Sequence, residues 1–184
     1  DSTQQQLNNT KSNGHHIRVN YDKMLDNKKT FVSVGGAYNR NNNHVDVDAS
    51  FKKKPEGTMA PLDLLSNNFW FHQTVSNLRG SIKQILGKNF SFTAGTSVER
   101  TDIWFELLKE NRDVKNNYPT WLPFANINKT WKDKFNITFA YRRSIRRPGI
   151  GELNPTIDFS DPYNIRFGNE KLEASTADNF DFVI

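Results

Sequence analysis

Arginine is the residue type in this 184-residue sequence that is best suited to binding chemistry. One short basic run contains Arg142, Arg143, Arg146 and Arg147. A guanidinium group can bind a carboxylate or a phosphate through two parallel hydrogen bonds, so these four residues are candidate ligand-binding residues. Charge that is simply solvated at the end of a strand is the alternative interpretation.

Histidine and aspartate offer two possible metal sites. His15 and His16 are adjacent, and adjacent residues of a strand point to opposite faces, so they are not expected to share a metal ion. His44, Asp46 and Asp48 would share one strand face and could coordinate a cation, although a solvated loop face is the favoured interpretation. The absence of cysteine excludes disulfides and cysteine-based zinc sites. We therefore predict no metal site.

Catalytic motifs are missing from the sequence. There is no cysteine nucleophile, no Gly-x-Ser-x-Gly elbow and no phosphate-binding glycine loop. Glu99, Asp102 and Glu106 could be regarded as paired acids, but no apolar segment nearby would separate their pKa values. We therefore predict no catalytic residues, no cofactor and no enzymatic activity.

The elements that would position these residues are strands. The clearest spans Lys134 to Arg142, where Phe135, Ile137, Phe139 and Tyr141 alternate with polar or small residues. This period of two places Arg142 on the face opposite Tyr141. Six further strands are predicted, over His16–Tyr21, Thr30–Tyr38, Phe69–Leu86, Asn89–Arg100, Trp121–Trp131 and Thr176–Ile184.

The predicted connections alternate in length. Tight turns are expected at Met24–Lys29, Gly87–Asn89 and Lys132–Asp133. Long connections are expected at Asn39–Asn68, Glu106–Thr120 and Arg146–Ser175. Within the first of these, His44–Phe51 also alternates, as part of an extended loop or as a strand that projects above a membrane. Alternating short and long connections are typical of an up-and-down transmembrane β-barrel.

The composition supports strands with one apolar and one polar face. Only 35% of the residues are hydrophobic and the mean hydropathy is -0.75, yet 12% are aromatic, which is unlike a disordered chain. No apolar run is long enough for a membrane helix. We predict an all-β, antiparallel up-and-down barrel segment of about seven strands. Because single-chain bacterial barrels have even strand numbers, residues 1–184 are expected to be part of a larger barrel domain.

A family resemblance strengthens this prediction. The sequence from Tyr141 runs through an arginine-rich Arg-Pro segment, Leu153-Asn154-Pro155, Asp161-Pro162-Tyr163 and Gly168-Asn169, and it is preceded by a hairpin at Leu86–Gly95 and a strand at Trp121–Ile127. These motifs resemble the barrel of TonB-dependent receptors of the Bacteroidota type. The sequence departs from the family at Glu170, where proline is usual, and at Gly149–Glu152, so details of this loop could differ.

The resemblance implies a barrel of 22 strands in the outer membrane of a Gram-negative bacterium, with a plug domain in the same full-length chain and energy supplied by the TonB system. The implied function is uptake of a scarce nutrient: an iron chelate, a vitamin, a glycan or a peptide. Outer-membrane lipid and lipopolysaccharide would be further partners. The alternative is a soluble basic β-domain that binds polyanions such as glycans or nucleic acid, since the net charge is +5. No basic and aromatic stripe suited to base stacking is evident, so nucleic acid is not expected.

Overall fold

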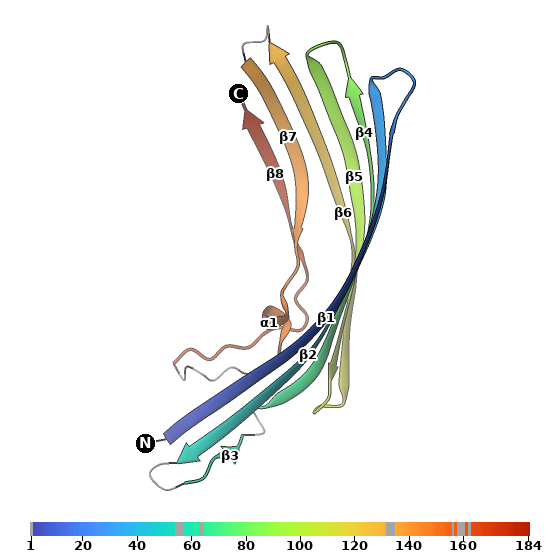
Figure 1. Cartoon of the computed structure of the whole chain (residues 1–184). Coiled ribbons are helices and arrows are strands. Elements are labelled where there is room, and N and C mark those ends of the chain that lie inside the picture. Colours follow the sequence, from blue (N-terminus) through green and yellow to red (C-terminus); the bar gives the residue numbers. More distant parts are fainter. Residues whose placement is uncertain are drawn as a thin grey trace.

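The computed structural model is a single, strongly curved antiparallel sheet (Figure 1). It describes residues 2–53, 57–62, 65–131, 135–155, 157, 161 and 163–184. The strands are β1 (Ser2–Met24), β2 (Thr30–Lys53), β3 (Ala60–Pro61), β4 (Asn67–Ile85), β5 (Phe90–Leu107), β6 (Arg112–Trp131), β7 (Phe135–Arg146) and β8 (Ser175–Val183), with one helix, α1 (Ile150–Leu153).

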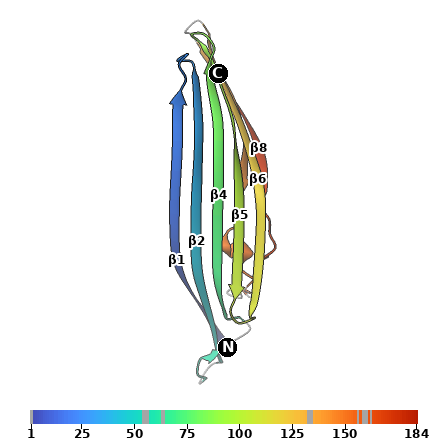
Figure 2. The same cartoon turned by 90° about the vertical axis from the view of Figure 1, so that its right-hand side faces the viewer.

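The long strands follow one another in the sheet in chain order, β1-β2-β4-β5-β6-β7-β8, and every pair is antiparallel. The short β3 pairs with β2 at the edge of this path. Figure 2 shows the strands side by side, and Figure 1 shows that they form about half of a barrel wall. The prediction of an all-β, up-and-down barrel segment with about seven strands is confirmed.

Tight turns join the strands at one end of the sheet, as the sequence predicted. Between β1 and β2, the Asn27 side-chain oxygen accepts hydrogen bonds from the backbone N–H groups of Lys29 and Thr30, both at 2.9 Å. Between β4 and β5, Gly87 has a φ of 77°, a conformation that glycine adopts without steric cost. The predicted turn at Lys132–Asp133, and the start of the strand at Lys134, lie outside the described residues.

The opposite end of the sheet corrects two predicted connections. The sequence predicted a long connection at Glu106–Thr120, but β5 continues to Leu107, β6 begins at Arg112, and a short hairpin joins them. Most of the predicted connection Asn39–Asn68 is also strand, because β2 continues to Lys53, β3 covers Ala60–Pro61 and β4 begins at Asn67. The third long connection, between Arg146 and Ser175, is confirmed. His44–Phe51 is therefore a continuation of β2. Of the two alternatives for this segment, strand and extended loop, the strand is observed.

The half of the sheet near the tight turns has an apolar convex face. Val19, Leu78, Trp121 and Phe180 lie on it and are 59–68% exposed. On β5, the apolar convex segment from Phe90 to Val98 covers nine residues, which is about the length that a membrane strand needs. The concave face of the same region is polar, with Asn, Ser and Arg side chains.

Farther from the tight turns, the apolar residues of each strand move from the convex face to the concave face. On β2, Val32 and Val34 point to the convex side, whereas Val45 and Val47 point to the concave side and are buried. The same change occurs on β4, β5 and β6. It produces one apolar core on the concave side, made by Val45, Val47, Phe69, Phe71, Ile103, Phe105, Leu107 and Leu153, with Val114, Tyr118 and Ile150 against it. The strands beyond the apolar belt are therefore held together by an inward-facing core.

The connection between β7 and β8 covers this core. We call residues 147–174 the inward loop; the described part of it that carries α1 lies on the concave side of the sheet (Figure 1). Leu153 of α1 is 1% exposed and forms part of the core. No helix in the described part of the chain is long and apolar enough to cross a membrane.

Candidate functional site

The strand register places polar side chains from four strands at the same height on the concave face. Asn20 of β1 pairs with Gly35 of β2, which is opposite Arg79 of β4, which is opposite Ser97 of β5. The neighbouring row runs through Arg18, Ala37, Asn77 and Glu99. Because β2 contributes only glycine and alanine to these rows, a hollow remains between the longer side chains of β1 and β4.

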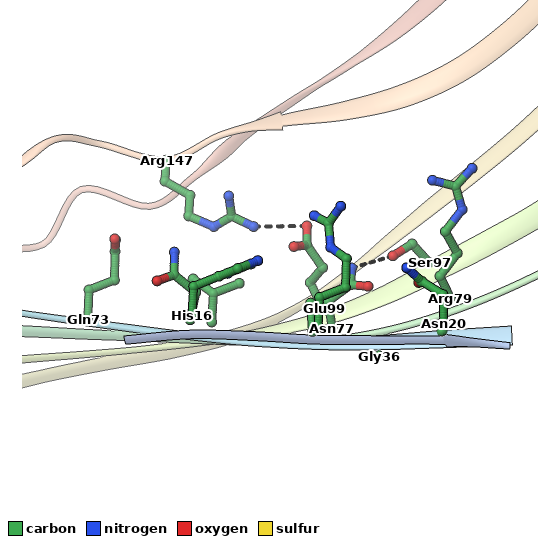
Figure 3. Close-up of a pocket in the computed structure, with 14 residues that line it drawn as sticks. His16, Asn20, Gly36, Gln73, Asn77, Arg79, Ser97, Glu99 and Arg147 are labelled. Carbon is green, nitrogen blue, oxygen red and sulfur yellow. Dashed lines mark hydrogen bonds and ion pairs between the residues drawn. The ribbon is translucent and has the colours of Figure 1, made fainter. Parts of the chain in front are cut away.

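This hollow has a volume of 380 Å³ and is the candidate functional site. Figure 3 shows that its labelled polar side chains rise from the sheet on the side where Arg147 of the inward loop lies. Gly35 leaves room for Asn20, since a Cβ there would lie 2.4 Å from the side-chain oxygen of Asn20 and would force this side chain to move. The polar lining consists of His16, Arg18, Asn20, Asn39, Gln73, Asn77, Arg79, Ser97, Glu99 and Arg147.

An ion pair closes the hollow from the loop side. Arg147 Nη2 lies 2.8 Å from Glu99 Oε1, and the two side chains are only 24% and 12% exposed (Figure 3). Arg147 Nε also donates a hydrogen bond of 3.2 Å to Thr101 Oγ1. The first residue of the inward loop is thereby attached to the middle of the wall. Within the wall, the Asn77 amide donates a hydrogen bond to Ser97 Oγ.

A second hollow, of 430 Å³, adjoins the first along β6 and β7. Phe124 lies in it, and the Arg79 guanidinium sits over the ring, 4.2 Å from its centroid. Gly95 leaves room for this ring, since a Cβ at that position would be 2.5 Å from Phe124 Cζ. Arg142, the cross-strand partner of Phe124, lines the same hollow. Arg79 therefore lies between the two hollows, with a cation-π contact to hold its orientation.

The far end of the inward loop is also attached to the wall. Arg112, at the start of β6, makes two hydrogen bonds to the Glu170 carboxylate, at 2.6 and 3.0 Å. The hydrogen bonds to Glu170 and Glu110 raise the pKa of Arg112 above its usual value. Within the loop, the Gly168 N–H donates to the Asn154 carbonyl at 2.8 Å, which joins its two arms.

The four arginines predicted from the sequence separate into different environments. Arg142 faces the concave side, as the alternation predicted. Arg143 faces the convex side, where it pairs with Asp178 at 2.8 Å. Arg146 pairs with Glu152 of α1 at 2.9 Å, with 77% of its side chain exposed. Arg142 and Arg143 both border the second hollow, Arg147 lines the first, and Arg146 lines neither, so the four do not form one cluster.

The other candidates from the sequence are also separated. His16 lines the first hollow, and its neighbour His15 is on the opposite face. His44 interacts with the Asn68 side chain at 2.7 Å and stacks on Trp70. In the part of the chain that the structure describes, no group of three or more His, Asp or Glu residues could hold a metal ion.

The three residues considered as paired acids, Glu99, Asp102 and Glu106, do not converge. Glu99 faces the concave side and binds Arg147, whereas Asp102 faces the convex side and pairs with Arg100 at 3.2 Å. Glu106 lies four residues after Asp102 in the same strand, so its side chain shares the convex face with Asp102. No arrangement of acid and base results from these residues.

Sequence reasoning missed Arg18 and Arg79, which are the two arginines on the wall of the first hollow. A usable signal was present for Arg18, because it alternates with Ile17 and Val19 and must lie on the polar face of β1. The register with β4, which brings Arg79 into a neighbouring row, depends on the number of residues in each turn and was not predicted.

A curved antiparallel sheet with an apolar convex belt and a polar concave wall defines a segment of a transmembrane β-barrel. Residues 1–184 match the outer membrane protein beta-barrel family, and the chain belongs to that family. Its location is therefore the outer membrane, which argues against a soluble polyanion-binding domain. No curated protein sequence matches the chain.

Among solved structures, the chain is similar to the crystal structure of the ferric citrate transporter FecA in the unliganded form, with a TM-score of 0.56 and 16% sequence identity. The similarity covers 78% of this chain and 22% of the FecA chain. At this level of identity the likeness concerns the fold. The chain thus corresponds to a limited part of a barrel whose architecture is also used by that transporter.

Proposed function

We propose that this chain forms part of the barrel wall and extracellular loops of a TonB-dependent receptor that takes up a scarce nutrient. The observation that carries the proposal is the polar hollow on the concave wall, enclosed by Arg147 of the inward loop. In a receptor of this kind, a ligand enters from outside, binds above a plug domain and is released inward when the TonB system supplies energy. The family resemblance of the motifs around residues 141–182 and the FecA-like fold are consistent with it.

The orientation follows from the two ends of the sheet. Barrels of this type have short turns at the periplasmic side and longer loops outside the cell. The tight turns at Asn27 and Gly87 would then face the periplasm, and the inward loop would face outward. The convex belt would contact membrane lipid. The residues above it, including the Arg143–Asp178 pair, would lie near the polar headgroups and the lipopolysaccharide phosphates.

The inward loop would control access to the lumen. It is attached to the wall through Arg147, Leu153 and Glu170, and its first residue, Arg147, covers one side of the hollow. A ligand that approaches the hollow from the outer side would pass the edge of this loop. The remaining barrel strands and the plug domain would complete the site. The nutrient could be an iron chelate, a vitamin, a glycan or a peptide.

Energy coupling provides the test. Cells that express the protein would be grown on limiting candidate nutrients, and accumulation of each labelled nutrient would be measured with and without TonB. We expect saturable accumulation of one nutrient that is lost when TonB is deleted or when a protonophore collapses the proton gradient. Entry that increases linearly with concentration and does not depend on TonB would instead identify a passive channel and contradict the proposal.

A further inference from the structure

The first hollow contains more positive charge than its acidic residues neutralise. Its lining has three arginines, Arg18, Arg79 and Arg147, and one glutamate, Glu99. Glu99 is already paired with Arg147. Among the described residues, Arg18 and Arg79 form no ion pair with a carboxylate. A concave surface lined by charge of one sign concentrates ligands of the opposite sign.

The groups around these arginines favour oxygen-rich ligands. Carboxamides from β1, β2 and β4 surround the hollow, at Asn20, Asn39, Gln73 and Asn77. A carboxamide both donates and accepts hydrogen bonds, so it can bind a hydroxyl group in either sense. A guanidinium group is donor-only and matches a carboxylate through two parallel hydrogen bonds. Together they form a surface for a molecule that carries a carboxylate next to several hydroxyl groups.

The orientation of Arg79 is set before any ligand binds. Its guanidinium lies over the Phe124 ring, and that ring occupies the space left by Gly95. A side chain held in this way loses less conformational freedom on binding than a free arginine. The volume of 380 Å³ lies within the range of small-molecule sites, so one monosaccharide-sized unit fits.

We propose that Arg18 and Arg79 bind the carboxylate of a hydroxylated acid in the hollow beneath the inward loop, with the carboxamides holding its hydroxyl groups. The inference rests on the proposed uptake function and names the ligand class of the same site. Two sources share this chemistry: a sugar acid within a glycan, and a hydroxycarboxylic acid that chelates a metal. The Arg147–Glu99 pair closes the site and leaves the two wall arginines for the ligand.

The test is a binding measurement on the full-length protein extracted from outer membranes in detergent. Isothermal titration calorimetry would use D-glucuronate and citrate as probes of the two sources, and D-glucose as a neutral control. We expect at least one acid to bind and D-glucose not to bind. Arg79→Gln and Arg18→Gln should each weaken binding of that acid about tenfold or more, because each removes a charged hydrogen-bond donor.

Arg143→Gln is the matched control, since Arg143 is on the convex face and pairs with Asp178. It should leave binding unchanged. Glucuronate binding alone would assign the site to sugar acids, and citrate binding alone would assign it to chelating acids. Binding of neither acid, or binding that Arg18→Gln and Arg79→Gln leave unaltered, would overturn the proposal.

Carboxylates of the plug domain are the competing occupant of the hollow. In that case neither acid binds, and Arg79→Gln lowers the thermal stability of the detergent-extracted protein, a result that also overturns the proposal. This experiment needs no TonB, so its failure is distinguishable from failure of the uptake function. A protein that accumulates a neutral nutrient in a TonB-dependent manner would retain the proposed function and lose this ligand assignment.

Discussion

The inward loop should open if Leu153 is shortened to alanine. Leu153 is 1% exposed and is the residue of α1 that enters the core with Phe69 and Phe105. Leucine-to-alanine changes in a core cost about 2–5 kcal/mol, and the lower part of this range applies where the surroundings can collapse. A loop at the edge of a core can collapse, so we expect about 2–3 kcal/mol, which corresponds to roughly a 30- to 140-fold increase in opening.

Hydrogen exchange of the detergent-extracted protein would measure this opening. The relevant amides are those of Asn154, Gly168 and Asn169, whose N–H groups bond within the loop. Leu108→Ala is the control, because Leu108 is 43% exposed at the hairpin between β5 and β6. Exchange at the three amides that is the same in Leu153→Ala as in the unaltered protein would refute the anchoring role of Leu153. An equal acceleration of amide exchange in β4 and β5 would show general unfolding instead.

Three other changes test the attachment of the loop and of the projecting strands. Arg147→Gln should leave Glu99 without its partner and destabilise the loop by roughly 1–3 kcal/mol, between the values for exposed and buried pairs. A double-mutant cycle with Glu99→Gln, measured by hydrogen exchange in the loop, would test this. A coupling energy of zero between the two residues would contradict the prediction. Gly168→Ala should disorder the loop, since a Cβ would lie 2.5 Å from the Asn154 carbonyl oxygen, and loop exchange equal to that of the unaltered protein would disprove this contact. Burial lowers the pKa of His72, with Arg40 acting in the same direction; its neutral form therefore stabilises the projecting strands above about pH 6.5, and this stability is lost as the pH falls through the lowered pKa. Thermal melting from pH 7.5 to 5 should show this loss, and His72→Phe should remove part of the pH dependence.

The strands in the apolar belt were predictable because one rule governs them. Phe135, Ile137, Phe139 and Tyr141 lie on the convex face, and the polar or small residues between them lie on the concave face. A period of two therefore identifies the strand. The prediction failed where the sequence Asn39–Asn43 makes both faces polar, which resembles a loop. Backbone pairing with β4 continues through this segment regardless of side-chain polarity.

The sequence did contain a signal that the strands continue, in the positions of their apolar residues. Val45 and Val47 have the opposite parity to Val32 and Val34, and Ile103 and other core residues of β5 repeat this change. Such a change indicates that the strand has left the membrane and that its apolar face has turned inward. The candidate site was less predictable. The Arg147–Glu99 pair joins a loop to a distant strand, and no local pattern reports the path of that loop.

The most direct test of the account is to map which parts of the convex face contact lipid. These 184 residues contain no cysteine, so Leu78→Cys in the belt and Asp48→Cys on the projecting part of β2 can be labelled in intact cells with a membrane-impermeant maleimide. We predict that Asp48→Cys is labelled rapidly, and that Leu78→Cys is labelled only after the membrane is dissolved. Equally rapid labelling of both thiols in intact cells, or labelling of Asp48→Cys only after lysis, would contradict a barrel wall whose strands extend out of the cell.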